Sequence, residues 1–66
     1  MLTKKETEVL TYLARGYVQK EVASELHVSA VAVKKQVGRA AQKLGARNTA
    51  HVVALALKEG LIKFPE

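Results

Sequence analysis

Residues 29–44 read SAVAVKKQVGRAAQKL, and this stretch has the pattern of one amphipathic helix. Ser29 is a typical N-cap, because its hydroxyl can accept a hydrogen bond from a free backbone N–H of the first turn. Gly45 is a typical stop, because glycine readily adopts the left-handed conformation that ends many helices. At about 100° per residue, one narrow apolar arc collects Val33, Val37, Ala40 and Leu44. The stretch therefore predicts a helix that buries this arc.

The opposite side of the same helix is basic and contains no acidic residue. It is formed by Val31, Lys35, Gly38, Arg39 and Gln42, with Lys34 at its edge. The chain has a net charge of +5 and has no acid between Glu25 and Glu59, so the positive charge is concentrated on this part of the sequence. A helix that lies in the major groove of DNA needs a face of this kind.

The residues before this helix predict a second helix that joins it through a sharp turn. Residues 19–26 place Val22, Ala23 and Leu26 at helical spacing. Only three residues, 27–29, separate this segment from the basic helix. The start of the second helix is weakly signalled, because Val18 has no side-chain acceptor at the N-cap position.

A first helix, about residues 4–15, is predicted by the capping box of Thr3 and Glu6 and by the stop at Gly16. Its apolar positions recur at helical spacing and are Val9, Leu10, Leu13 and Ala14. Tyr12 and Tyr17 are expected to cover the core, with stacking on bases as the alternative.

A fourth helix, about residues 49–59, is expected after a cap at Asn48 or Thr49. Its core arc is predicted to be Val53, Ala56 and Leu57, continued by Leu61. A second apolar side of the helix favours a partner helix, so the predicted dimer interface is Val52, Leu55 and Glu59. In the alternative interpretation, Val52 and Leu55 cover the tail residues Ile62 and Phe64.

Length and composition exclude several classes of protein. A chain of 66 residues is one small domain, residues 1–66, with a limited core. It contains no Cys and no Asp, so we expect no disulfide, no metal site and no cofactor. It also lacks paired carboxylates or a nucleophile with a base, and is not expected to be an enzyme. No apolar run could span a membrane, and no export signal opens the chain, so we expect a cytoplasmic protein.

Blocks along nearly the whole chain resemble the LuxR/FixJ-type, GerE-like DNA-binding domain. They are Leu2-Thr3-x-Lys5-Glu6-x-Glu8-Val9-Leu10, Ala14-x-Gly16, Lys20-Glu21-Val22-Ala23-x-x-Leu26-x-Val28-Ser29, Val33-Lys34, Lys43-Leu44-Gly45-Ala46 and Gly60-Leu61-Ile62. The resemblance implies an all-α, four-helix domain whose third helix is the recognition helix of a helix-turn-helix and whose fourth helix supports homodimerisation. The chain departs from the usual family residues at Val18, Ala32, Gln36, Gly38 and Thr49.

The predicted function is sequence-specific binding of double-stranded DNA by a homodimeric transcription regulator on an inverted-repeat operator. We expect Lys34 and Lys35 to donate to base edges and Val31 to contact a thymine methyl group. Phosphate contacts are expected from Gln36, Arg39, Lys43 and Arg47. Gly38 either permits close approach to DNA or is merely tolerated. The alternative function is a stand-alone interaction module that pairs through its fourth helix with a full-length relative and inhibits it.

Overall fold

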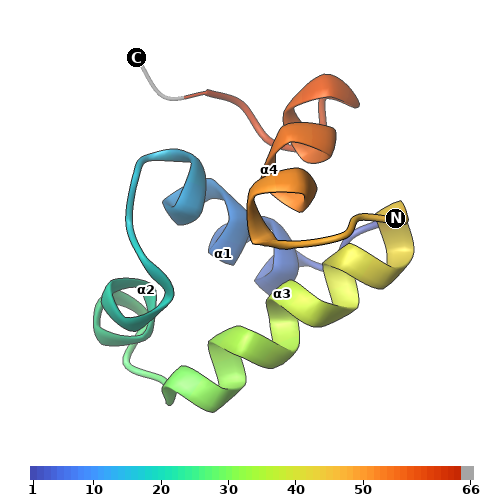
Figure 1. Ribbon diagram of the computed structural model, residues 1–66. Coiled ribbons are helices and arrows are strands. Elements are labelled where there is room, and N and C mark those ends of the chain that lie inside the picture. Colours follow the sequence, from blue (N-terminus) through green and yellow to red (C-terminus); the bar gives the residue numbers. More distant parts are fainter. Residues whose placement is uncertain (65–66) are drawn as a thin grey trace.

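A computed structural model describes residues 1–64, which form four helices and no strand (Figure 1). The helices are α1 (Lys4–Ala14), α2 (Gln19–Leu26), α3 (Ala30–Leu44) and α4 (Thr49–Lys58). The predicted all-α class and the four predicted helices are confirmed, with ends that differ by at most one residue. Residues 65 and 66, which the predicted domain includes, lie outside the described residues.

The helix starts are fixed by the side chains that the sequence indicates. Thr3 and Glu6 form the predicted capping box, with the Glu6 backbone N–H donating to Thr3 Oγ1 at 3.1 Å and the Thr3 N–H donating to Glu6 Oε1 at 2.9 Å. Ser29 Oγ accepts from the Ala32 N–H at 3.0 Å at the start of α3. At α4 the cap is Asn48, whose Oδ1 accepts from the His51 N–H at 2.8 Å.

The remaining helix boundaries are set by the backbone. Val18 caps α2 without a side-chain acceptor, but its N–H donates to Glu21 Oε1 at 2.8 Å. Gly45 ends α3 in the left-handed region with φ of 68°, as the stop signal predicts. The turn between α2 and α3 uses His27 in the same region, with φ of 57°.

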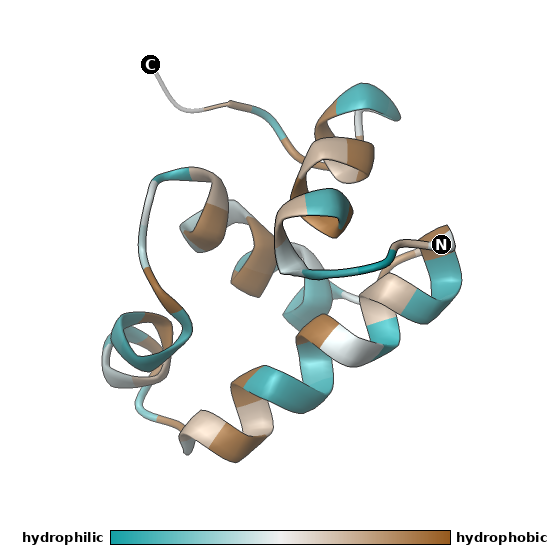
Figure 2. Cartoon of the chain, viewed as in Figure 1, coloured by the Kyte–Doolittle hydropathy of each residue, from teal (hydrophilic) through white to brown (hydrophobic). Residues whose placement is uncertain are grey.

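The core lies where α3 packs against the three other helices. Along α3, hydrophobic and hydrophilic residues alternate with the helical period (Figure 2). Val33, Val37 and Ala40 are buried as predicted, and Leu44 is half-buried against them. They meet buried side chains of the other elements, which are Val9, Leu10, Val22, Ala23, Val52, Ala56 and Ile62.

The predicted orientation of α4 is wrong for one interface residue. Val52 is 0% exposed and belongs to the core together with Ala56, so it cannot contribute surface to a dimer. Val53 and Leu57, which were expected at the centre of the core arc, are only half-buried. The side of α4 that packs against α3 and the tail carries Val52 and the small residue Ala56, and these two residues are buried.

The tail supports the alternative interpretation, in which Val52 covers tail residues and does not form a dimer interface. Ile62 is 5% exposed and lies in the same core cluster as Val52. Phe64, in contrast, is 69% exposed. The turn after α4 therefore completes the core at Ile62 and leaves Phe64 on the surface.

As a consequence, α4 presents a different side to solvent, which we call the outer α4 face and define as Ala50, Val53, Ala54 and Leu57. Two of these residues are exposed and two are half-buried, and none is charged. Beside this face lies a groove of about 540 Å³, lined by Leu13, Tyr17, Val18, Gln19, Thr49, Ala50 and Val53.

The two tyrosines take the first of their predicted roles. Tyr12 and Tyr17 pack edge to face with ring centroids 5.1 Å apart. Both rings also contact the hydrophobic core. They therefore cover the core, as expected.

Among residues 1–64, no helix combines the length and the apolar content needed to cross a membrane.

Candidate nucleic-acid interface

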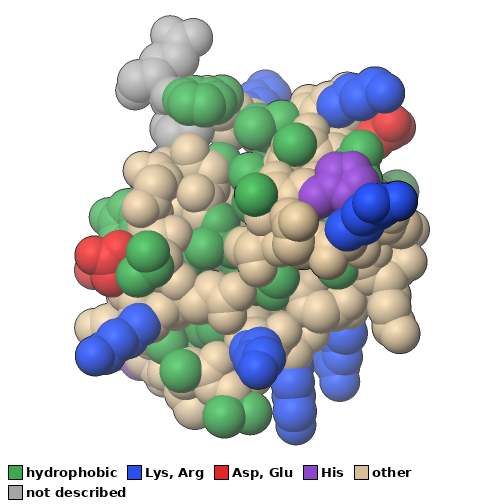
Figure 3. Space-filling view, viewed as in Figure 1, with side chains coloured by type: hydrophobic (Ala, Val, Ile, Leu, Met, Phe, Trp, Pro, Cys, Tyr) green, Lys and Arg blue, Asp and Glu red, His purple; other side chains and the backbone are tan. Residues whose placement is uncertain are grey.

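The side of α3 that faces away from the core gathers most of the predicted DNA contacts on one surface. Exposed residues on it are Val31, Lys34, Lys35, Gly38, Arg39 and Gln42. We call this surface the outer α3 face. Figure 3 shows Lys and Arg side chains projecting along the lower side of the molecule, which is where α3 runs in Figure 1.

The first turns of α3 combine charge with small side chains. Val31 is 63% exposed, although it is apolar, and it lies between exposed Ala30 and half-buried Ala32. Lys34 and Lys35 follow along the same outer side. A helix that enters a major groove with such a start can bring its methyl groups and its lysine ammonium groups to base edges.

Gln36 lies at the rim of the outer α3 face. Its side chain is half-buried and lines a recess of about 110 Å³ between α1, the α2–α3 turn and α3. The predicted phosphate contact of Gln36 therefore depends on a side chain that reaches out from this recess.

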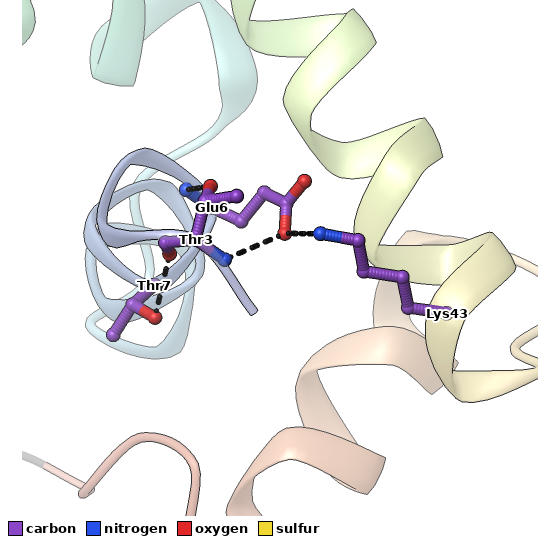
Figure 4. A network of polar contacts seen from close by, with 4 residues as sticks. All are labelled: Thr3, Glu6, Thr7 and Lys43. Atoms are coloured by element: carbon purple, nitrogen blue, oxygen red, sulfur yellow. Dashed lines mark hydrogen bonds and ion pairs between the residues drawn. The ribbon is translucent and has the colours of Figure 1, made fainter. Parts of the chain in front are cut away.

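Lys43, which was also predicted to contact phosphate, reaches away from the outer α3 face. Its Nζ lies 2.8 Å from Glu6 Oε1, and Figure 4 shows the side chain reaching from α3 towards α1. The Lys43 side chain is 37% exposed, whereas that of Glu6 is 1% exposed. Because a buried carboxylate needs a compensating partner, the ammonium group pairs with Glu6.

Glu6 keeps its charge in this buried position. Burial on its own raises the pKa of the Glu6 carboxyl group, but the hydrogen bonds from Lys43 and Thr3 and the positive charge of Lys43 outweigh burial and lower the pKa below its ordinary value. The pair joins the first turn of α1 to the last turn of α3.

From the sequence, Glu6 was predicted to have a capping role only, and this ion pair was missed. A signal was present, because Glu6 precedes Val9 by three residues and Leu10 by four. That spacing places the carboxylate on the buried side of α1.

The corner between α3 and α4 carries a second basic position, Arg47, at the surface. Its backbone N–H donates to His51 Nδ1 at 3.0 Å, and the His51 N–H donates in turn to Asn48 Oδ1. No role for His51 was predicted from the sequence. Two side chains, those of Asn48 and His51, therefore accept backbone hydrogen bonds in this corner.

Gly38 lies in the interior of α3, on the outer face, and a Cβ added there would meet no atom within 4 Å. Gly38→Ala is expected to raise the free energy of unfolding by about 1 kcal/mol, because Ala loses less backbone freedom than Gly in a helix. Thermal melting followed by circular dichroism measures this change. If the glycine is merely tolerated, the DNA affinity of Gly38→Ala should equal that of the parent. A melting temperature below that of the parent would contradict ordinary helical geometry at this position.

Comparison with known proteins agrees with this arrangement. Residues 1–56 match the family model described as bacterial regulatory proteins, luxR family. The chain belongs to the luxR family. The structure of the transcription factor GerE superimposes on this luxR-family domain with a TM-score of 0.90 at 26% identity, covering 97% of this chain and 96% of that one. The predicted resemblance is thereby confirmed, and the four helices form the helix-turn-helix DNA-binding domain of this family.

Longer relatives contain a similar segment. The oxygen regulatory protein NreC of Staphylococcus aureus strain JH9 is 38% identical over 64 residues. The NreC protein of strain NCTC 8325 / PS 47 has the same identity over the same length. These matches cover 97% of this luxR-family chain but only 30% of each relative, so the chain spans about a third of their length.

Proposed function

We propose that the chain binds double-stranded DNA sequence-specifically as a homodimer and regulates transcription, with α3 as the recognition helix and residues 1–66 as one DNA-binding unit. The observation that carries this proposal is the outer α3 face. It is basic, exposed and backed by a buried apolar arc on a capped helix of 15 residues. Membership of the luxR family supports the same role.

On this proposal, residues at the start of α3 read sequence and residues further along position the protein. Lys34 and Lys35 donate to base edges, and Val31 contacts a thymine methyl group. Arg39, Arg47 and the rim residue Gln36 contact phosphates, which carry no sequence information. Gly38 adds no contact of its own.

The proposed dimer forms through the outer α4 face. This face is free of charge, and it continues into the apolar groove beside Ala50 and Val53. The predicted interface residues Leu55 and Glu59 lie on the other edge of α4, at a half-buried and an exposed position, and this proposed seam does not include them. Two recognition helices related by a two-fold axis would enter successive major grooves about 34 Å apart, which requires an inverted repeat.

Selection of bound duplexes from a random pool tests this function. We expect enrichment of an inverted repeat whose half-sites are centred about 10 base pairs apart. A pool that shows no sequence preference after repeated rounds would contradict sequence-specific binding.

The division of roles on α3 gives a second prediction. Lys34→Ala or Lys35→Ala should weaken binding to the selected duplex by about 1–3 kcal/mol and relax the preference at particular base pairs. Arg47→Ala should weaken all duplexes to a similar extent and make the salt dependence shallower by about one charge.

Titrations of selected and scrambled duplexes at several salt concentrations separate these effects. Lys58→Ala is the matched control, because it removes one exposed charge at the last turn of α4, outside the proposed contacts. Identical profiles for the Lys34 and Arg47 variants would refute the division of roles.

The alternative function, an inhibitory module, uses the same outer α4 face to pair with a longer relative. It is distinguished by gel filtration with and without the selected duplex. A chain that pairs with a relative but never shifts with DNA would favour the inhibitory module over the regulator.

A further inference from the structure

His51 closes the corner between α3 and α4 with two hydrogen bonds. Its Nδ1 accepts from the Arg47 backbone N–H at 3.0 Å, and its own backbone N–H donates to Asn48 Oδ1 at 2.8 Å. The first of these bonds spans four residues and is made by a half-buried side chain. Arg47 itself is exposed.

The chemistry of this bond defines the state of the imidazole ring. Nδ1 can accept this hydrogen bond only when it carries no proton. In an ordinary capping box, a Glu or Gln at this helical position reaches back to the N-cap N–H. In this corner His51 Nδ1 accepts from Arg47, the residue before the N-cap Asn48. Arg47 is also the residue with the proposed phosphate contact.

The residues on either side of Arg47 are held by backbone hydrogen bonds, and Arg47 itself is held through His51. The chain leaves α3 at Gly45, and the Ala46 N–H donates to the Ala41 carbonyl at 2.9 Å. Within residues 1–64, the Arg47 N–H bonds to His51 alone. The His51 ring is therefore the group that binds the N–H of the peptide that precedes the Arg47 side chain.

We propose that His51 is a positioning residue for DNA binding, which holds the α3–α4 corner so that the Arg47 side chain is aimed before DNA arrives. The proposal rests on the function proposed above, in which Arg47 contacts phosphate. A group that is already oriented loses less freedom on binding, so its contact contributes more to affinity.

The test uses a double-mutant cycle on the whole chain with a mixed-sequence DNA duplex, because a phosphate contact does not depend on sequence. His51→Leu removes the acceptor, and His51→Asn keeps one, because the Asn Oδ1 lies close to the place of Nδ1. Arg47→Ala removes the side chain that is positioned. Melting temperatures are measured alongside, and His51→Ala replaces His51→Leu if that variant does not fold.

We expect His51→Leu to weaken binding about three- to eightfold at about 0.1 M salt, which is the size of one phosphate contact. His51→Asn should bind within about twofold of the parent, a difference of only about 0.4 kcal/mol. In the Arg47→Ala background, His51→Leu should have no further effect on affinity, although it lowers stability in both backgrounds.

Two results would overturn the proposal, and they are distinguishable. Equal losses from His51→Leu with and without Arg47 would mean that His51 acts only on folding. Arg47→Ala binding as tightly as the parent would refute the phosphate contact itself, and with it the inference built on that contact.

Discussion

Val52→Glu is expected to leave the chain unfolded at room temperature. Val52 is 0% exposed, so the new carboxylate would be buried without a partner, at a free-energy cost of several kcal/mol. A core in a chain of this length rarely supplies more than about 3–5 kcal/mol of net stability. Circular dichroism at neutral pH measures the loss of helix.

Val53→Glu is the matched control for this prediction. Val53 is the next residue along α4, but it is half-buried on the outer α4 face. The variant should keep its helical spectrum and lose self-association in sedimentation experiments. A folded Val52→Glu protein would contradict an α4 orientation that buries Val52 against α3.

Lys43→Ala is expected to lower the free energy of unfolding by about 2 kcal/mol. Breaking a fully buried ion pair costs about 3–5 kcal/mol, because one charge is left without a partner. The Lys43 side chain is 37% exposed, so water compensates part of that loss. Chemical denaturation measures the change, with Lys34→Ala as a surface control that should leave stability nearly unchanged.

The same pair predicts how stability depends on pH. The pKa of Glu6 is lowered by folding from about 4.5, so its contribution is complete above that value and is lost as pH falls through the lower pKa of the folded state. In Lys43→Ala the lowering of the Glu6 pKa by Lys43 is lost while burial still opposes the charged carboxylate, so less stability depends on keeping Glu6 ionised. The stability difference between parent and variant should therefore shrink in acid. A constant difference from about pH 7 to about pH 3 would refute the role of this pair.

Sequence patterns were sufficient for the part of the fold in which independent signals coincide. In α3 the cap at Ser29, the apolar arc and the stop at Gly45 all indicate the same helix, and the structure has it within one residue. The outer α3 face could also be predicted, because a helix that buries one apolar arc exposes the opposite side.

The orientation of α4 could not be obtained in the same way. Residues 52–57 read VVALAL and place apolar side chains all round the helix. A helical wheel then has no single centre, and the largest side chains suggested the wrong one. The core side is decided by contact with α3 and by Ile62 of the tail, which lie elsewhere in the sequence.

Contacts between residues far apart on the helices, or across the corner, could not be predicted from the sequence either. The sequence shows that Lys43 belongs to a basic cluster, but only the packing of α1 on α3 brings it to Glu6. The bond of His51 to Arg47 likewise depends on the backbone path through the corner. The first contact gives Lys43 a partner inside the domain, and the second connects Arg47 to His51. Neither contact follows from charge alone.

The outer α3 face is proposed as the surface that contacts DNA, and nuclear magnetic resonance titration with the selected duplex maps that surface residue by residue. We predict that the backbone amide signals that shift most are those of Val31, Lys34, Lys35, Gly38 and Arg39, with a smaller group at Arg47. Signals of the outer α4 face should shift little once the dimer has formed. Large shifts confined to α1, α2 or α4, with the α3 signals unmoved, would contradict this claim.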